Sequence, residues 1–122
     1  MDWVRFGGIA EDLALAYLRL VGMEPLARHF RAGKAEVDLV MQEGECVVLV
    51  EVKYRGAGSI GRGAEVVRGA QMRRLEQAAA AWLMRHGLSD VRFDVVLMDE
   101  EPEGLRLRHH RGAFGASGRI PV

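Results

Sequence analysis

The sequence predicts an α/β fold in which helices flank a mixed sheet of about four to five strands. Three observations support this prediction: two segments carry apolar residues at helical spacing, two apolar β-branched segments are joined by a short turn, and a further apolar segment follows the second helical one. Strands that pair in sequence and then return across a helix are expected to form a mixed sheet with helices packed against it.

The two predicted helices cover residues 9–20 and 68–86. Each carries apolar residues on one face, and each is followed by a glycine, which commonly ends a helix. The residues of these apolar faces are Ala10, Leu13, Ala14, Tyr17 and Leu18 in the first helix, with Gly22 after it, and Leu75, Ala78, Ala79 and Trp82 in the second, with Gly87 after it.

The predicted strands follow the same logic. Residues 25–31 alternate weakly and are expected to form an outer strand, while residues 35–41 and 46–54 form a hairpin. Residues 91–98 are predicted to be a mostly buried strand. Residues 105–109 are expected to pair with a neighbour across a turn at residues 102–104.

The hairpin carries four charged residues in otherwise apolar, β-branched segments. Glu36 and Asp38 lie on its first strand, and Glu51 and Lys53 lie on its second. An ionised side chain in an apolar strand loses hydration that only a partner, a metal or a shifted proton can replace. Acidic pairs beside a lysine therefore indicate metal-assisted phosphodiester chemistry.

The turn decides how these charges meet. If residues 42–45 close a two-residue loop, Asp38 lies opposite Leu49 and Glu36 lies opposite Glu51. All four charges then share one face, because alternate strand residues point the same way. Asp38 would lie diagonal to Glu51 at about 7 to 8 Å between backbones, near enough for both carboxylates to bind one ion. A one-residue slip would reverse the facing of Asp38.

Asp38 followed by Glu51-Val52-Lys53 on the next strand resembles the core of the PD-(D/E)xK nucleases. The surrounding segments resemble the bacterial YraN (UPF0102) family, which is similar to archaeal Holliday-junction resolvases. The resemblance runs from about residue 8 to residue 114. It rests on Gly8-Ile9-Ala10-Glu11-Asp12, Tyr17-Leu18 with Gly22, Ala35-Glu36-Val37-Asp38-Leu39-Val40, Val50-Glu51-Val52-Lys53-Tyr54-Arg55, Arg73-Arg74-Leu75 and Arg92-Phe93-Asp94-Val95-Val96.

The resemblance implies a restriction-endonuclease-like core and a Mg²⁺-dependent endonuclease that acts on structured or branched DNA, with Mn²⁺ as a substitute ion. Asp38, Glu51 and Lys53 would be catalytic. Glu11, Asp38, Glu51 and the carbonyl of Val52 would hold the metal, while Lys53 positions the attacking water and offsets charge in the transition state.

Some of these residues can also be explained without a metal site. Glu11 also fits an ordinary exposed acid at the start of a helix, where the helix dipole favours a carboxylate. Glu51 and Lys53 could form a buried ion pair by themselves. The chain also departs from the family pattern at three positions: Ala35 replaces a usual Gly, His29 replaces Asn, and Gln71 replaces Lys, so that a positive charge is lost.

The distribution of arginines indicates a nucleic-acid surface, although the net charge is zero. Fifteen of the seventeen cations are arginines, and six lie between residues 55 and 85 against only two acids. Arg55 joins this patch if its strand has ended, or lies on the face opposite Lys53 if the strand stays regular. The alternative for the patch is a solvated helix face. The candidate nucleic-acid-binding residues are Arg55, Arg62, Arg68, Gln71, Arg73 and Arg74.

A second functional class remains open, namely a protein that binds nucleic acid or another partner and keeps the nuclease fold without turnover. The neutral net charge and Gln71 favour it. A dinucleotide-binding function is disfavoured. Residues 56–61 match G-x-G-x-x-G, but the acid expected about twenty residues later is absent, since Ala81 lies inside the second predicted helix.

Length and composition predict one domain over residues 1–122, with its core at about 8–114 and a flexible tail at 115–122. A chain of 122 residues that is 49% hydrophobic can build a single core and little more. We expect a cytoplasmic protein without a membrane segment, in which the lone Cys46 is a structural thiol. A resolvase-like role favours a symmetric homodimer, because cutting two equivalent strands needs two sites.

Overall fold

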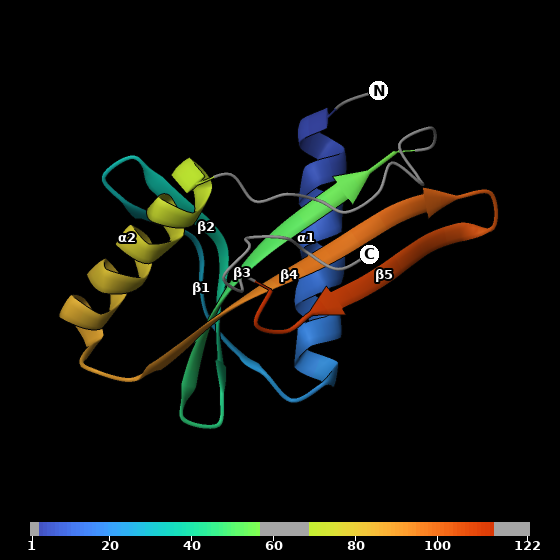
Figure 1. Ribbon diagram of the computed structural model, residues 1–122. Coiled ribbons are helices and arrows are strands. Elements are labelled where there is room, and N and C mark those ends of the chain that lie inside the picture. The colour runs from blue at the N-terminus through green and yellow to red at the C-terminus, as the bar shows by residue number, and fades with distance from the viewer. Residues whose placement is uncertain (1–2, 57–68, 114–122) are drawn as a thin grey trace.

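The computed structural model describes the backbone of residues 3–56 and 69–113, and the side chains of residues 8–56 and 72–113. The predicted fold class is confirmed: a five-stranded mixed sheet is flanked by two helices (Figure 1), as in a nuclease-like core. The elements are α1 (Trp3–Leu20), β1 (Glu24–Ala32), β2 (Ala35–Glu43), β3 (Cys46–Arg55), α2 (Gly69–His86), β4 (Asp90–Glu101) and β5 (Gly104–His110).

The strands lie side by side in chain order, from β1 to β5. All neighbours are antiparallel except β3 and β4, which are parallel and are connected through α2. A parallel pair needs such a crossover, because its second strand must start at the same end of the sheet as its first. The predicted return of the chain across the second helix is therefore confirmed.

The two helices cover opposite faces of the sheet (Figure 1), and β3 is buried on both sides. Val48 and Val50 pack in the cluster under α1, whereas Val47 and Leu49 pack in the cluster under α2. Strands buried on both faces are continuously apolar, as residues 47–50 are. The helix residues in these two clusters are Ala10, Ala14 and Leu18 of α1 and Leu75, Ala78, Ala79 and Trp82 of α2.

The predicted register of the β2–β3 hairpin was wrong by two residues. Val40 rather than Asp38 lies opposite Leu49, and the two-residue loop consists of Gly44 and Glu45. Gly44 has a φ of 58°, a left-handed conformation that glycine adopts without steric cost. Because the error is an even number of residues, every side chain of β3 keeps the face predicted for it.

A buried polar network joins β4, β5 and α1. Asp94 is fully buried and accepts hydrogen bonds from Arg92, from the Nε2 atom of His109 at 2.8 Å and from the backbone amide of Gly112 at 3.0 Å. The Nδ1 atom of His109 lies 3.0 Å from the hydroxyl of Tyr17 on α1. Burial opposes ionisation of Asp94, but the bonds from His109 and Arg92 prevail and lower its pKa to about 2.

Two other predictions concern the ends of the chain and the membrane. The tail at residues 115–122 lies outside the described residues. Neither α1 nor α2 has the combination of length and apolar character that a transmembrane helix requires. The single domain remains a prediction.

Candidate active site

The candidate site lies where β2 and β3 part. Their pairing ends at Leu39 and Val50; beyond that point β2 pairs only with β1, while β3 continues along β4 to Arg55. Figure 1 shows the two strands running apart. Asp38 and Glu51 are the first residues beyond the last pair, so both stand at the opening of this fork.

The side chain of Asp38 takes over a backbone hydrogen bond at the fork. Its Oδ2 atom accepts the amide proton of Val52 at 2.8 Å, which satisfies a donor that no longer has a partner on β2. Regular alternation is also interrupted here, because Val37 and Val40 both pack in the cluster under α2 while Leu39 packs under α1. This interruption lets Asp38 approach residues of α1.

Asp38 thereby joins an acidic cluster with Glu11 and His29. One potential ligand atom from each of these three residues lies within 4.8 Å of the others. The Nε2 atom of His29 is 2.9 Å from Glu11 Oε1, and its Nδ1 atom is 2.8 Å from Glu36 Oε1. The bond to Glu36 is the main cause that raises the pKa of His29, with the charges of Glu11 and Asp38 adding to it.

Glu11 is not an ordinary exposed acid at the start of a helix, which was the alternative explanation for this residue. Its side chain is only 13% exposed and contacts both His29 and the Nη2 atom of Arg28, the latter at 3.3 Å. Asp12, the next residue, is 68% exposed and pairs with Arg28 at 3.0 Å. The two adjacent acids therefore occupy different environments, and only Glu11 belongs to the cluster.

Glu51 carries the largest upward shift of any carboxyl group described. Burial and then the charge of Asp38 raise its pKa to about 8, although Lys53 offsets part of this effect. Burial also raises the pKa of Asp38, against the hydrogen bond from Val52. The Oε1 atom of Glu51 is buried and has no hydrogen-bond partner among the described residues. Such a group is costly unless a cation or proton reaches it.

Lys53 lies two residues beyond Glu51 on the same face of β3 and is partly buried. In the described part of the chain it forms no ion pair within 4.0 Å, so the predicted alternative of a closed Glu51–Lys53 pair is not found. The ammonium group is thus not committed to a carboxylate of that region. It lowers the pKa of Glu51 through its charge alone.

The structure brings Glu11 and Asp38 together with His29, whereas Glu51 is not part of that cluster and is linked to it through the charge of Asp38. Carboxylate oxygens of Glu11, Asp38 and Glu51 are ligands that Mg²⁺ and Mn²⁺ prefer. The contact found for Val52 is through its amide rather than through the predicted carbonyl. His29 was not predicted as a site residue; its place opposite the Asp38 region of β2 and near Glu36 in sequence was the available signal.

Of the predicted nucleic-acid-binding residues, the structure describes the side chains of Arg55, Arg73 and Arg74. Arg55 is within β3, only 12% exposed, and its Nε and Nη2 atoms bond to the buried Asp99 at 2.5 and 3.0 Å. Placing it opposite Lys53 was wrong, because residues 53 and 55 are two apart and share a face. Arg73 and Arg74 are exposed on α2. Arg62, Arg68 and the side chain of Gln71 lie outside the described residues.

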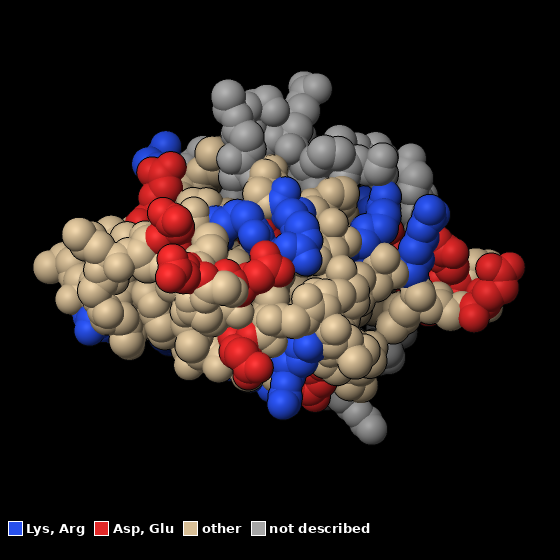
Figure 2. Space-filling view, turned by 90° about the horizontal axis from the view of Figure 1, so that it is seen from below, with Lys and Arg blue, Asp and Glu red and all other residues tan. Residues whose placement is uncertain are grey.

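Basic and acidic side chains are mixed on one face of the described part of the molecule (Figure 2). Figure 2 shows lysine and arginine side chains interspersed with acidic ones on the face seen from below. This agrees with a net charge of zero. Any nucleic-acid contact on this side would therefore depend on particular arginines and not on a general basic coat.

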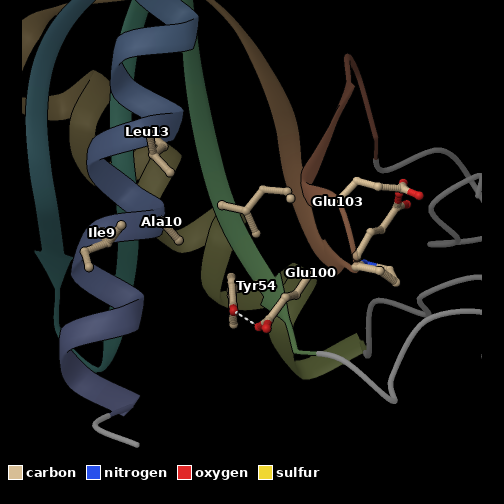
Figure 3. Close-up of a pocket in the computed structure, with 10 residues that line it drawn as sticks. Ile9, Ala10, Leu13, Tyr54, Glu100 and Glu103 are labelled. Carbon is tan, nitrogen blue, oxygen red and sulfur yellow. Dashed lines mark hydrogen bonds between the residues drawn. The ribbon is translucent and has the colours of Figure 1, made fainter.

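A pocket of about 460 Å³ lies apart from the residues predicted for the site. Ile9, Ala10 and Leu13 of α1 form its apolar wall, and Tyr54 with the β4–β5 turn forms the other side (Figure 3). The hydroxyl of Tyr54 donates a short hydrogen bond to Glu100 across its floor. Leu13, predicted on the buried face of its helix, is 44% exposed here.

Comparison with known proteins identifies the family of this chain. The model of the family described as "Uncharacterised protein family UPF0102" matches residues 10–98. A UPF0102 protein of Frankia casuarinae is 43% identical over 111 residues, which cover 88% of this chain and 94% of the relative. One of Desulforapulum autotrophicum is 43% identical over 112 residues, covering 90% and 93%. One of Vibrio campbellii is 41% identical over 100 residues, covering 79% and 82%. The chain therefore belongs to the UPF0102 family.

Proposed function

We propose that this protein is a metal-dependent endonuclease that acts on structured or branched DNA. The observation that carries the proposal is the fork, where Asp38 and Glu51 stand together beside Lys53 and where one buried oxygen of Glu51 has no described partner. A carboxyl with a pKa of about 8 is poised to release its proton when a cation arrives.

The carboxylates and the lysine of the site have different roles in the proposed reaction. Asp38 and Glu51, with Glu11 beside them, hold the cation through carboxylate oxygens. Bound Mg²⁺ or Mn²⁺ supplies Lewis-acid polarisation of the phosphoryl oxygen and a lowered pKa for its water. Lys53 positions the attacking water and offsets the negative charge that develops on the phosphate. The water oxygen would bond to phosphorus and lose a proton to solvent, the ester P–O bond would break, and the leaving oxygen would take up a proton from solvent.

A second candidate is a nucleic-acid-binding or partner-binding protein that keeps this fold without turnover. One observation favours it: His29 bridges Glu11 and Glu36, and the hydrogen bond to Glu36 raises its pKa, which favours the protonated imidazole that would offset the charge of the cluster without a metal. In that case the acidic cluster is stabilised by an internal cation. Binding would then be indifferent to Mg²⁺ and to Asp38.

Asp38→Asn separates the two candidates. We expect the substitution to abolish cleavage of a four-way DNA junction in Mg²⁺ or Mn²⁺ and to remove metal binding measured by isothermal titration. Affinity for the junction should stay within about threefold, because Asp38 repels rather than binds phosphate. Asp12→Asn is the matched control, since Asp12 is exposed and outside the cluster; it should cut like the wild type.

Two results would overturn the nuclease proposal. One is equal cleavage by the wild type and Asp38→Asn, which would place the activity elsewhere. The other is junction binding without any cleavage or metal uptake by either protein, which would support the non-catalytic candidate.

A further inference from the structure

His29 lies level with Asp38 in the sheet. The paired residues on either side of His29 on β1 place it across from Asp38 on β2. Its φ is 51°, a left-handed conformation that is uncommon outside glycine but that histidine and asparagine adopt more often than most residues. Regular alternation is also interrupted at Asp38. Both strands therefore depart from ideal geometry at the same level, next to Glu11 of α1.

The imidazole of His29 is open to solvent, with 51% of its side chain exposed. Its Nε2 atom lies 2.9 Å from Glu11 Oε1, and one ligand atom from each of Glu11, His29 and Asp38 lies within 4.8 Å of the others. Ligands at right angles around an ion with bonds of about 2.1 Å are about 3 Å apart. The Nε2 atom thus stands at the spacing of a neighbouring ligand, where a cation from solvent has access to it.

The other ring nitrogen of His29 is held by a carboxylate. Nδ1 donates a hydrogen bond to Glu36 Oε1 at 2.8 Å, and Glu36 Oε2 pairs with Arg31 Nη2 at 3.2 Å. Histidines that bind metals almost always donate their other N–H to such a partner, which fixes the ring and leaves the opposite nitrogen to the metal. Glu36 already holds the ring of His29 in this way, with Nε2 facing Glu11.

A separate observation indicates a cation at this place. Glu51 Oε1 is buried without a hydrogen-bond partner among the described residues, and a buried polar atom in this state calls for a ligand or a proton. Because β2 lies between β1 and β3, Asp38 stands between His29 on one side and Glu51 on the other. A cation bound by Asp38 would therefore lie between a nitrogen donor and the carboxyl group that lacks a partner.

A nitrogen ligand changes which cation the site prefers. Mg²⁺ is a hard ion that takes oxygen ligands and keeps several waters. Imidazole nitrogen suits first-row transition ions instead. Two carboxylates with one imidazole therefore favour a transition cation over Mg²⁺, whereas carboxylates alone would not provide this discrimination.

We propose that His29 is a direct nitrogen ligand of the cation held by Glu11 and Asp38, that Glu36 orients its ring, and that the site therefore prefers a first-row transition cation to Mg²⁺. This inference rests on the proposed function, since it assumes that the fork binds a cation. On binding, Nε2 gives its lone pair to the cation and any proton that it carries passes to solvent, while Nδ1 keeps its proton for Glu36. Glu36 is thus a positioning residue.

Titration of Mn²⁺ and of Mg²⁺ into the full chain, without DNA, tests the selectivity. The wild type should bind Mn²⁺ more tightly than Mg²⁺. His29→Asn should weaken Mn²⁺ binding at least about tenfold, and should change Mg²⁺ binding less than about threefold, because the asparagine amide supplies an oxygen. Asparagine also tolerates the left-handed backbone. Glu36→Gln should weaken Mn²⁺ binding about tenfold, as loss of an outer partner does.

His86→Asn is the matched control. His86 lies at the end of α2 and stacks on Trp82, apart from the cluster. The same substitution at this position should leave the affinities for both ions unchanged.

Electron spin echo envelope modulation of bound Mn²⁺ detects the nitrogen ligand itself. Coupling to one directly bound ¹⁴N is expected in the wild type, and it should disappear in His29→Asn and persist in Glu36→Gln. Labelling the histidines of the wild type with ¹⁵N should replace this coupling by that of ¹⁵N. The labelled wild type keeps the test decisive even if His29→Asn does not fold, as judged by thermal unfolding.

The inference is overturned if Mn²⁺ bound to the wild type shows no nitrogen coupling, if the wild type binds no Mn²⁺, or if His29→Asn loses affinity for both ions equally. The two proposals fail separately. Asp38-dependent cleavage of the junction by a Mn²⁺ protein without nitrogen coupling would reject the role of His29 alone. Nitrogen-coupled Mn²⁺ in a wild type that does not cleave the junction would reject the nuclease alone.

Discussion

Glu51 lies in the middle of β3, partly buried, at the point where β2 leaves it. Its pKa rises from 4.5 to about 8 because of burial and the charge of Asp38. Between these two pH values the folded protein holds a proton that the unfolded chain has released. Folding stability from this group is therefore present below pH 4.5 and is lost as the pH rises towards 8.

Glu51→Gln should remove this pH dependence. Without metal, we expect the free energy of unfolding at pH 8 to increase by about 1 to 3 kcal/mol, because the neutral amide carries no ionisation cost. At pH 4 the two proteins should be equally stable. Urea unfolding in EDTA at both pH values measures the effect, and Glu45→Gln in the exposed turn is the control. A parallel pH dependence in wild type and Glu51→Gln would contradict the assignment.

At the scale of elements, periodicity and turn residues predicted both helices and all the strands of the sheet, and they placed each β3 side chain on its observed face. The predicted register of the β2–β3 hairpin was wrong because Glu43-Gly44 and Gly44-Glu45 are both acceptable two-residue loops with glycine. The local sequence does not favour one loop over the other. The interruption of alternation at Asp38 and the left-handed His29, with a φ of 51°, depend on packing between elements. Spacing alone therefore could not reveal the cluster of Glu11, His29 and Asp38.

The loop itself gives a test of the observed register. A Cβ atom at Gly44 would meet nothing within 4 Å, so Gly44→Ala should cost only the strain of a φ of 58°, about 1 kcal/mol. Gly44→Asn should cost less, because asparagine tolerates this conformation better. Denaturant unfolding measures both, and junction cleavage should not change. A Gly44→Ala protein as stable as the wild type would indicate that the hairpin had shifted to another register.

At the scale of the whole molecule, the candidate site draws its residues from four elements of the fold. Glu11 comes from α1, His29 from β1, Asp38 from β2 and Glu51 from β3. Only Asp38, Glu51 and Glu11 were predicted, because the motif resembles known nucleases. The contribution of β1, and the burial of Arg55 against Asp99 on β4, required the sheet order to be known. A cation held by Glu11, Asp38 and Glu51 would link α1, β2 and β3.

Binding of Mn²⁺ or Mg²⁺ should therefore raise the thermal midpoint of the entire chain. At a concentration of about 100 times Kd the expected gain is about 2.7 kcal/mol. That is several degrees for a chain of this size. The shift should grow from pH 6 to pH 8, because the cation displaces the proton that Glu51 holds below about 8. Glu11→Gln should reduce the shift and Asp38→Asn should abolish it, whereas Asp12→Asn should keep it. An unchanged midpoint of the wild type at millimolar metal, or an equal rise in Asp38→Asn, would mean that the fork does not bind a cation.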